Sequence, residues 1–416
     1  MAVPESFRAL RIRNYRRYFI GQVISLCGTW AQTIGMSWLV LDLSNDSGVA
    51  VGIVTAMQFV PVLLFGMWMG VLADRFDKRR FIVVTQIALA SCALVLSIVD
   101  FADVVNLPMV YGLAFLFGVA TAADTPARLS FVVEMVGPTD LPNALALNSA
   151  VVNAGRIIGP AIAGAVIAAG GTGFCFLVNA VSYVGTIVAV SSMRAHDLQQ
   201  PPPVRKARGQ IREALGYVWS SPILRSDVML MGCLGFVALN FNVVLPVLAK
   251  VTFHGSASTY SWMASAMGVG ALVSALVLAT LDRPYGRRLI YANSILAVAL
   301  LAAALMPTLL GVVAVMIVLG AGQVIGASSA NALLQLDADP AVRGRCTALF
   351  SMTTSSATLF GGLLAGVITE AFGARWALAF GSVGTVVVVL AFAPVLFRDH
   401  ADAPGRRQAS PIPAAT

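Results

Sequence analysis

Residues 70–80, Gly-Val-Leu-Ala-Asp-Arg-Phe-Asp-Lys-Arg-Arg, decide the fold, because this strongly charged stretch separates two long apolar segments. We interpret it as a short connection between two membrane spans. A partial copy follows 208 positions later, where Asp282-Arg283 and Arg287-Arg288 repeat Asp74-Arg75 and Arg79-Arg80 ahead of another apolar run. The chain is therefore predicted to contain two copies of one unit.

The composition is that of a polytopic membrane protein. Of 416 residues, 58% are hydrophobic and 11% are charged, and the mean hydropathy is +0.85, which a water-soluble domain could not hide in a core. The net charge of +8 does not indicate a nucleic-acid partner, because Lys and Arg cluster between apolar runs. The five cysteines lack paired spacing and the three histidines lie far apart, so neither a disulfide framework nor a metal site is predicted.

Apolar windows predict twelve spans, because about 20 apolar residues cross a hydrocarbon core of ~30 Å. The first six fall at 18–41, 49–72, 80–100, 107–127, 144–169 and 172–192. The second six fall at 224–249, 258–280, 287–306, 308–333, 346–369 and 376–397.

The charges predict which side of the membrane each connection faces. With both termini in the cytoplasm, the cytoplasmic segments hold 24 of the 27 Lys and Arg, and the outer loops hold only Lys250 and Arg375. This is the positive-inside pattern. A second span follows the first almost at once, so we interpret the first as uncleaved and not as a signal peptide.

Five regions follow from these spans. They are a cytoplasmic N-terminal segment, a six-span bundle, a cytoplasmic linker, a second six-span bundle and a disordered tail, at 1–17, 18–192, 193–223, 224–397 and 398–416. In the linker, apolar residues recur at helical spacing from Gln210 to Trp219. This predicts either a short amphipathic helix on the membrane surface or a solvated linker.

The two bundles repeat beyond the charged loop. Phe117 to Leu147 align without a gap on Leu319 to Leu349, at an offset of 202 positions. Two parallel six-helix halves are therefore expected, and in transporters such halves enclose a site near the bilayer midplane.

Charged residues gather at the cytoplasmic ends of the spans around the loop. Asp124 and Arg128 are spaced i, i+4 and so share a helix face, at the same depth as Asp74 and Arg79. The pattern predicts an ion-pair network. The alternative is that these charges only set topology.

The span 144–169 carries small residues and one charge in its interior. Gly155, Gly159 and Gly164 would let a neighbouring helix approach closely, and Pro160 would bend the helix. Arg156 lies near mid-membrane, where an unpaired charge costs roughly 2.5–3.5 kcal/mol. It therefore needs a partner or a cavity, and an anionic substrate is one of the partners considered. The alternative is that it only bonds to carbonyls.

The loop at 70–80 resembles the signature of the major facilitator superfamily, Gly-x-Leu-Ala-Asp-Arg-x-Gly-Arg-Arg/Lys. Asp77 stands where that family has Gly, and we expect it to accept the left-handed turn conformation. The runs Asp124-Thr125-Pro126-Ala127-Arg128 and Leu141 to Asn148 resemble the enterobactin-exporter branch more specifically. So does the run from Arg156 to Pro160.

This resemblance implies an all-α membrane protein with twelve transmembrane helices in two pseudo-symmetric six-helix bundles. It also implies a charge network that latches the halves on the cytoplasmic side in the outward-facing state. Its members here are Gly70, Asp74, Arg75, Arg79, Asp124, Arg128, Asp282 and Arg283. The Gly-Pro motif of the span 144–169 is similar to one that marks exporters.

In the family the first, fourth, seventh and tenth helices line the central cavity. The candidates for contact with substrate are accordingly Gln22, Thr29, Gln32, Asn240, Asn242, Gln323 and Asn331. Arg156 of the fifth span is a further candidate, because its charge lies near mid-membrane. For any of the amides and hydroxyls, polar packing between helices is an equally good interpretation.

The expected function is secondary transport in a bacterial-type cytoplasmic membrane, without a cofactor. We expect a monomer in the lipid bilayer that exports a small amphipathic molecule, such as a drug, siderophore or secondary metabolite, using the proton gradient. The alternative is uptake or facilitated diffusion by the same fold. A membrane-embedded enzyme or sensor is disfavoured, because no loop is long enough for a catalytic domain.

Overall fold

The computed structural model describes residues 5–194, 198–199, 210–278, 285–339 and 342–398, and within these ranges the chain forms helices and no strand. The helices of the first half are η1 (Glu5–Arg11), α1 (Arg13–Leu43), α2 (Gly48–Arg75), α3 (Lys78–Phe101), α4 (Leu107–Gly170) and α5 (Thr172–Ser191). Those that follow are α6 (Gln210–Ser220), α7 (Pro222–Val237), α8 (Phe241–Val247), η3 (Leu248–Thr252), α9 (Ala257–Leu278), α10 (Tyr285–Leu305), α11 (Leu309–Asp337), α12 (Arg343–Phe372) and α13 (Ala374–Arg398).

Eleven helical stretches of the described chain are long and apolar enough to cross a membrane, and one of them, α4, supplies two spans. It has 64 residues, but its backbone leaves the helical region at Gly137 (φ 69°, ψ 177°). The ring of Tyr18 lies 6.4 Å from that of Phe131, while the hydroxyl of Tyr15 donates to the carbonyl of Ala144 (2.8 Å). Both arms of α4 thus lie beside the same end of α1. The predicted count of twelve spans is confirmed.

The helix extends beyond the predicted spans 107–127 and 144–169 and continues almost to the turn between them. Glycine adopts the positive φ of position 137 at little steric cost. Pro138 can begin the next helical arm, since a first-turn residue needs no backbone N–H bond. A single glycine thus replaces the predicted connection.

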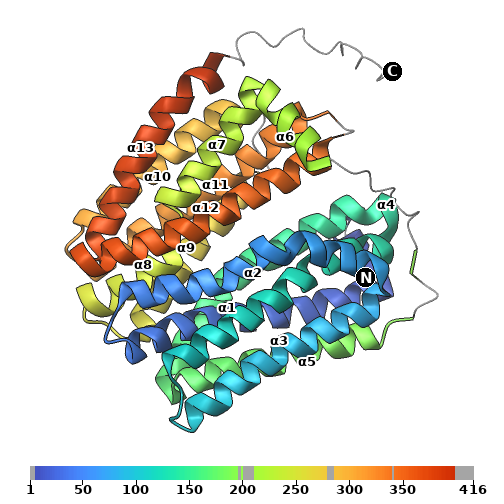
Figure 1. Cartoon of the computed structure of the whole chain (residues 1–416), viewed down its shortest axis with the longest axis horizontal. Coiled ribbons are helices and arrows are strands. Elements are labelled where there is room, and N and C mark those ends of the chain that lie inside the picture. Colours follow the sequence, from blue (N-terminus) through green and yellow to red (C-terminus); the bar gives the residue numbers. More distant parts are fainter. Residues whose placement is uncertain (1–4, 195–197, 200–209, 279–284, 340–341, 399–416) are drawn as a thin grey trace.

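The two halves lie together at one end of the molecule and diverge toward the other (Figure 1). We call the diverging end the basic end; it carries η1, the α2–α3 turn, Gly137 and α6. We call the joined end the distal end; it carries the turns at 44–47, Gly171, 253–256 and Gly373.

The apolar cores follow the same division. At the distal end one cluster contains buried side chains of both halves, including Val40 and Phe176 of the first and Val244 and Met263 of the second. Toward the basic end the first half has its own cluster around Phe131, and the second half has another. The halves therefore share one core at the distal end and form two cores at the basic end.

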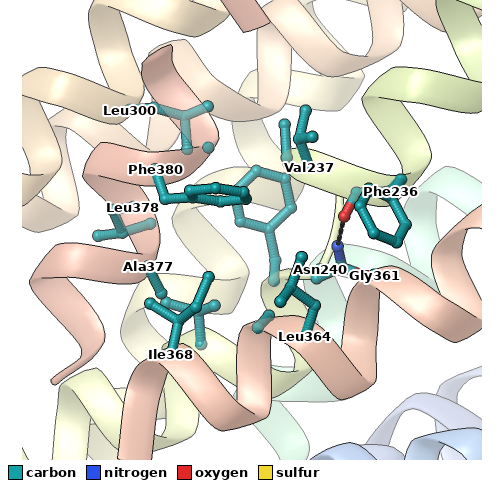
Figure 2. A pocket seen from close by; sticks show the side chains of 15 residues that line it. Phe236, Val237, Asn240, Leu300, Gly361, Leu364, Ile368, Ala377, Leu378 and Phe380 are labelled. Carbon is teal, nitrogen blue, oxygen red and sulfur yellow. Dashed lines mark hydrogen bonds between the residues drawn. The ribbon is translucent and has the colours of Figure 1, made fainter. Parts of the chain in front are cut away.

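The seventh span, predicted as continuous over 224–249, is broken between α7 and α8. The side chain of Asn240 lies in this break, and its Nδ2 donates to the carbonyls of Gly235 (3.2 Å) and Phe236 (3.1 Å). Figure 2 shows the bond to Phe236 beside a small pocket in the second half. Asn240, proposed for the cavity from the sequence, thus satisfies backbone carbonyls that the break leaves free.

Two smaller predictions have different outcomes. Asp77 is not left-handed (φ −57°, ψ 113°); it begins α3, and its side chain accepts from the backbone N–H of Arg80 (2.8 Å). An aspartate serves well in this capping position, which explains why no glycine is needed. The helix predicted from Gln210 to Trp219 is present as α6, with Val218 buried and Trp219 exposed.

Candidate functional site

The second arm of α4 lies between α1 of its own half and α9 of the other half. A Cβ atom added at Gly155 would lie 3.0 Å from the side chain of Leu26 in α1, and one at Gly159 would collide with Trp30. On the other side, a Cβ at Gly164 would lie 2.7 Å from Cβ of Ser261 in α9. The small residues of this span thus allow close packing on both neighbours.

The helix α9 approaches this arm with a small residue of its own. A Cβ added at Gly268 would lie 2.8 Å from the carbonyl oxygen of Arg156. Next to this contact, the hydroxyl of Ser265 donates to the carbonyl of Ile157 (3.1 Å). The backbone carbonyls of Arg156 and Ile157 therefore form part of the contact between the halves. The side chain of Arg156 takes no part in this contact.

The side chain of Arg156 lies against an aromatic ring, and no described acidic residue forms an ion pair with it. Its guanidinium carbon is 5.6 Å from the centre of the Trp30 ring, a distance typical of a cation–π contact. Its Nε is buried, and no described residue accepts a hydrogen bond from the guanidinium. A cation in this position leaves hydrogen-bonding capacity unused, because guanidinium carries five N–H donors.

Arg156 lines a cavity of about 160 Å³ between the halves. Its polar lining includes Asn242 and Gln323 of the second half, and Pro160 closes it beside Arg156. Its apolar and aromatic wall is formed by Trp30, Ile34, Leu239, Phe241, Leu245, Tyr260, Ala264, Met267 and Ala271. A mostly apolar cavity with a few polar groups suits a small amphipathic ligand.

The other polar residues proposed from α1 form hydrogen bonds inside the first half. Gln32 accepts from the side chain of Asn179 on α5 (2.7 Å). Thr29 donates to the carbonyl of Ser25 (2.9 Å) and lies 3.3 Å from the hydroxyl of Tyr183. Gln32 and Thr29 therefore take part in polar packing between helices, which was the alternative to substrate contact in the sequence analysis.

Gln22, also proposed for the cavity, belongs to the charge network at the basic end of the first half. Its Oε1 accepts from Arg128 (2.6 Å), and Arg128 pairs with the buried Asp124 at 2.7 Å. The other carboxylate oxygen of Asp124 accepts from Thr85 (2.8 Å) and Gln86 (2.9 Å). The network joins α1, α3 and α4, and these bonds all lie within one half.

The remaining charged candidates do not join this network through any bond recorded among the described residues. Arg79 donates to the carbonyls of Val190 (3.0 Å) and Ser191 at the end of α5, and Arg75 is exposed. At Gly70 an added Cβ would lie 3.9 Å from Pro126, an ordinary contact. The side chain of Asp74, together with Asp282 and Arg283, lies outside the described residues.

Asn331 is likewise placed away from the cavity. It lies in the last third of α11, where its side-chain oxygen accepts from Gln335 one turn further on (2.9 Å). Of the eight residues proposed for the cavity, three therefore line it: Arg156, Asn242 and Gln323.

The distal end holds a charged contact between the halves that the sequence analysis missed. Lys250 of η3 lies 2.5 Å from Asp42 and 2.7 Å from Asp46 of the first half. Its ammonium also lies 5.5 Å from the centre of the Trp38 ring. The available signal was that Lys250 is one of only two basic residues in the predicted outer loops.

A second contact strengthens this joint. Glu370 of α12 accepts from the hydroxyl of Ser47 and from the backbone N–H of Val49 (3.0 Å) at the start of α2. Beside it the backbones of α2 and α12 meet, since a Cβ added at Gly366 would lie 2.7 Å from the carbonyl oxygen of Gly48. The distal joint thus combines ion pairs, helix capping and close backbone packing.

Comparison with known proteins agrees with this architecture. The profile of transmembrane secretion effectors matches residues 5–411. The chain is 27% identical to the multidrug efflux pump Tap of Mycolicibacterium fortuitum, over 83% of this chain and 87% of Tap. It is 25% identical to the enterobactin exporter EntS of Citrobacter koseri, over 85% of this chain and 84% of EntS.

A further relative is the staphyloferrin A transporter of Staphylococcus aureus, 24% identical over 63% of this chain and 66% of that protein. Among solved structures, a bacterial homologue of the human lysosomal transporter Spinster in an inward-facing, unoccupied conformation superimposes with a TM-score of 0.72. The identity is 14%, and the match covers 94% of this chain and 99% of the other. The chain belongs to the transmembrane secretion effector family of the major facilitator superfamily and is a multi-pass secondary transporter.

Proposed function

We propose that this transporter exports a small amphipathic molecule in exchange for protons, by alternating access to the cavity between its halves. The observation that carries the proposal is the guanidinium of Arg156, which has no hydrogen-bond partner among the described residues and lies at the polar side of a largely apolar cavity. A planar guanidinium binds carboxylates and similar anions through two parallel bonds. The substrate expected is therefore an apolar or aromatic molecule that carries an anionic group.

Export is favoured over uptake by the Gly-Pro motif around Arg156 and by the activities named for Tap and for the enterobactin exporter. The second candidate, uptake or facilitated diffusion, would use the same cavity. The two differ in direction, so a transport assay with defined gradients separates them.

Alternating access assigns different roles to the two ends. The described ion pairs and shared core join the halves at the distal end and leave the basic ends of the two bundles with separate cores. This arrangement suits an inward-open state if the basic end faces the cytoplasm. In the outward-open state the distal joint would separate, and the charges around Asp74 would then latch the basic ends.

The orientation follows from the charge asymmetry of the sequence, with the regions 1–17, 193–223 and 398–416 in the cytoplasm. Single cysteines at Ala2, Gln200 and Ala414, in a background without native cysteines, test it. They should resist an impermeant thiol reagent in intact cells and react after permeabilisation. Labelling of any of them in intact cells would overturn the orientation.

The remaining elements of the proposal are a bacterial-type cytoplasmic membrane, a monomer, and a transport cycle without chemical change of the substrate or a bound cofactor. The proton gradient would supply the energy. A monomer is proposed because both halves of the cavity come from one chain. Cross-linking in native membranes would test this assignment.

Purified protein in vesicles with an internal pH dye tests the function. Panels of siderophores, drugs and other amphipathic acids would be added on either side, with Arg156→Ala protein as control. Wild-type protein should move protons only when a substrate is present, in the opposite direction to the substrate. Substrate flux that ignores the pH gradient would favour facilitated diffusion, and co-directional flux would favour uptake.

A further inference from the structure

A second ionisable side chain without a hydrogen-bond partner among the described residues lies in the second half, away from the cavity. Asp227 of α7 has no exposed surface, and both carboxylate oxygens are buried without a hydrogen-bond donor among the described residues. Asp124 is similarly buried, but three side chains donate to it. The two acids therefore differ in their partners and not in their burial.

Asp227 lies in a part of α7 that packs into an apolar core. Its neighbours in α7, Leu224, Val228, Leu230 and Met231, belong to the basic-end core of the second half. That core also contains Leu289 of α10, Leu333 of α11, Phe350 of α12 and Val389 of α13. A carboxylate in such a place would lose its hydration without compensation, so it takes up a proton instead.

Among the described residues, no charged group on the packed helices donates a hydrogen bond to Asp227. On α11, Asp337 is itself an acid and adds no positive charge beside Asp227. On α12, Arg343 donates to the carbonyl of Ala338 (3.4 Å), and Arg345 lies in the same first turn. On α6, Tyr217 accepts from the backbone N–H of Asp339 (3.0 Å). Glu370 of α12 and Arg375 of α13 lie at the distal ends of their helices.

We propose that Asp227 is the proton-binding site of this transporter, an inference that rests on the proposed proton-linked export. In the arrangement described, the carboxylic acid holds one proton. Release of this proton to cytoplasmic water leaves the carboxylate, and the proton is regained from the outer side when the distal end is open. One proton then moves inward for each cycle.

The chain connects this acid to the distal joint. The helix α7 ends at the break around Asn240, and the same span continues through α8 to Lys250, which holds the first half through Asp42 and Asp46. Each opening and each closing of the distal joint would move one end of this span. The break allows α7 to shift against α11 and α12, which admits water to the acid.

The experiment compares Asp227→Asn with wild-type protein in vesicles, using two transport modes. Substrate exchange at equal pH on both sides should be retained, because Asn resembles the protonated acid. Accumulation driven by a pH gradient should be lost. The matched control is Asp103→Asn, since Asp103 is exposed in the turn between α3 and α4. It should keep both modes.

Infrared spectroscopy supplies a readout that needs no substrate. The carbonyl band of a protonated carboxylic acid should be present at neutral pH in wild-type protein and in Asp103→Asn, and should be lost in Asp227→Asn. If Asp227→Asn does not fold, Asp227→Glu should keep coupling with a shifted pH midpoint. A pH midpoint unchanged in Asp227→Glu would overturn the inference.

The outcomes separate this inference from the proposed function. Gradient-driven accumulation by Asp227→Asn, or an unchanged infrared band, overturns the role of Asp227 while proton-linked export stands. Wild-type protein that transports substrate without moving protons overturns the coupling itself, and the role of Asp227 with it.

Discussion

The two ends of the molecule use charge in different ways. At the basic end Asp124, Arg128 and Gln22 form bonds inside the first half, whereas at the distal end Lys250 reaches from the second half to Asp42 and Asp46 of the first. Bonds inside one half persist when the halves move, so they contribute to folding. Bonds between the halves exist in one conformation only, so they set the balance between conformations.

The largest effect is expected at the basic end. Asp124→Ala leaves Arg128 partly buried without its carboxylate, and breaking such a pair costs about 3–5 kcal/mol of folding free energy. We expect a large fall in the midpoint of thermal unfolding in detergent. The control is Asp140→Ala, which removes the partly exposed partner of Arg8 and should cost about 1 kcal/mol or less. Wild-type stability in Asp124→Ala, with altered conformational populations, would favour a latch over a folding role.

The next effect concerns the cavity between the two halves. Arg156→Ala should reduce transport roughly 10- to 100-fold, because a hydrogen bond to a charged group contributes about 1.5–3 kcal/mol. Folding should be kept, since the helix contacts at this position use backbone. Arg156→Lys should recover part of the activity without the planar fork.

Arg375→Ala is the matched control for Arg156. Its guanidinium carbon also lies over a ring, 5.7 Å from the centre of Phe253, but both residues belong to the distal end of the second half. It should transport at the wild-type rate. Transport is measured as initial rates in vesicles. If Arg156→Ala and Arg375→Ala lose transport equally, the loss comes from removing an arginine–aromatic contact and not from the position of Arg156 in the cavity.

The sequence predicted the span count and the close-packing glycines, because hydropathy and small-residue spacing are properties of single segments. It did not predict the bond from Lys250 to Asp42, since 208 positions separate them. The sequence also assigned Gln22 and Gln32 to the cavity. A polar stripe on one helix has the same sequence pattern whether it faces a ligand or another helix. Their partners, Arg128 and Asn179, follow only from the packing. Asp227 was missed because its significance lies in the absence of partners among the described residues.

At the distal end, Lys250→Ala should shift the population toward the outward-open state roughly 5- to 30-fold, if two partly exposed ion pairs contribute about 1–2 kcal/mol together. Spin labels at Val104 and Leu310, both exposed at the distal end, would report a longer distance. The thermal midpoint should change little, in contrast to Asp124→Ala. An unchanged distance distribution would show that packing of α2 on α12 suffices to close this end.

The smallest effects separate two helix caps of similar geometry. Asp77 caps α3 at the basic end, where its side chain accepts from the N–H of Arg80 at 2.8 Å. Ser47 caps α2 at the distal end, accepting from the N–H of Ala50 at 3.2 Å, and it also donates to Glu370 of the other half. Replacing either by Ala should cost about 1 kcal/mol of helix stability.

Only the distal cap should alter the conformational balance, because only its side chain bonds across the halves. Ser47→Ala should therefore lengthen the distance between labels at Val104 and Leu310 slightly, and Asp77→Ala should leave it unchanged. Hydrogen exchange checks the caps themselves, since the amides of Ala50 and Arg80 should exchange faster in the respective variants. Asp77→Gly should lose only a few tenths of a kcal/mol, because glycine is itself tolerated as a cap. If Asp77→Ala moves the distal labels as far as Ser47→Ala does, the basic-end turn is coupled to the distal joint, and the division between folding bonds and conformational bonds fails.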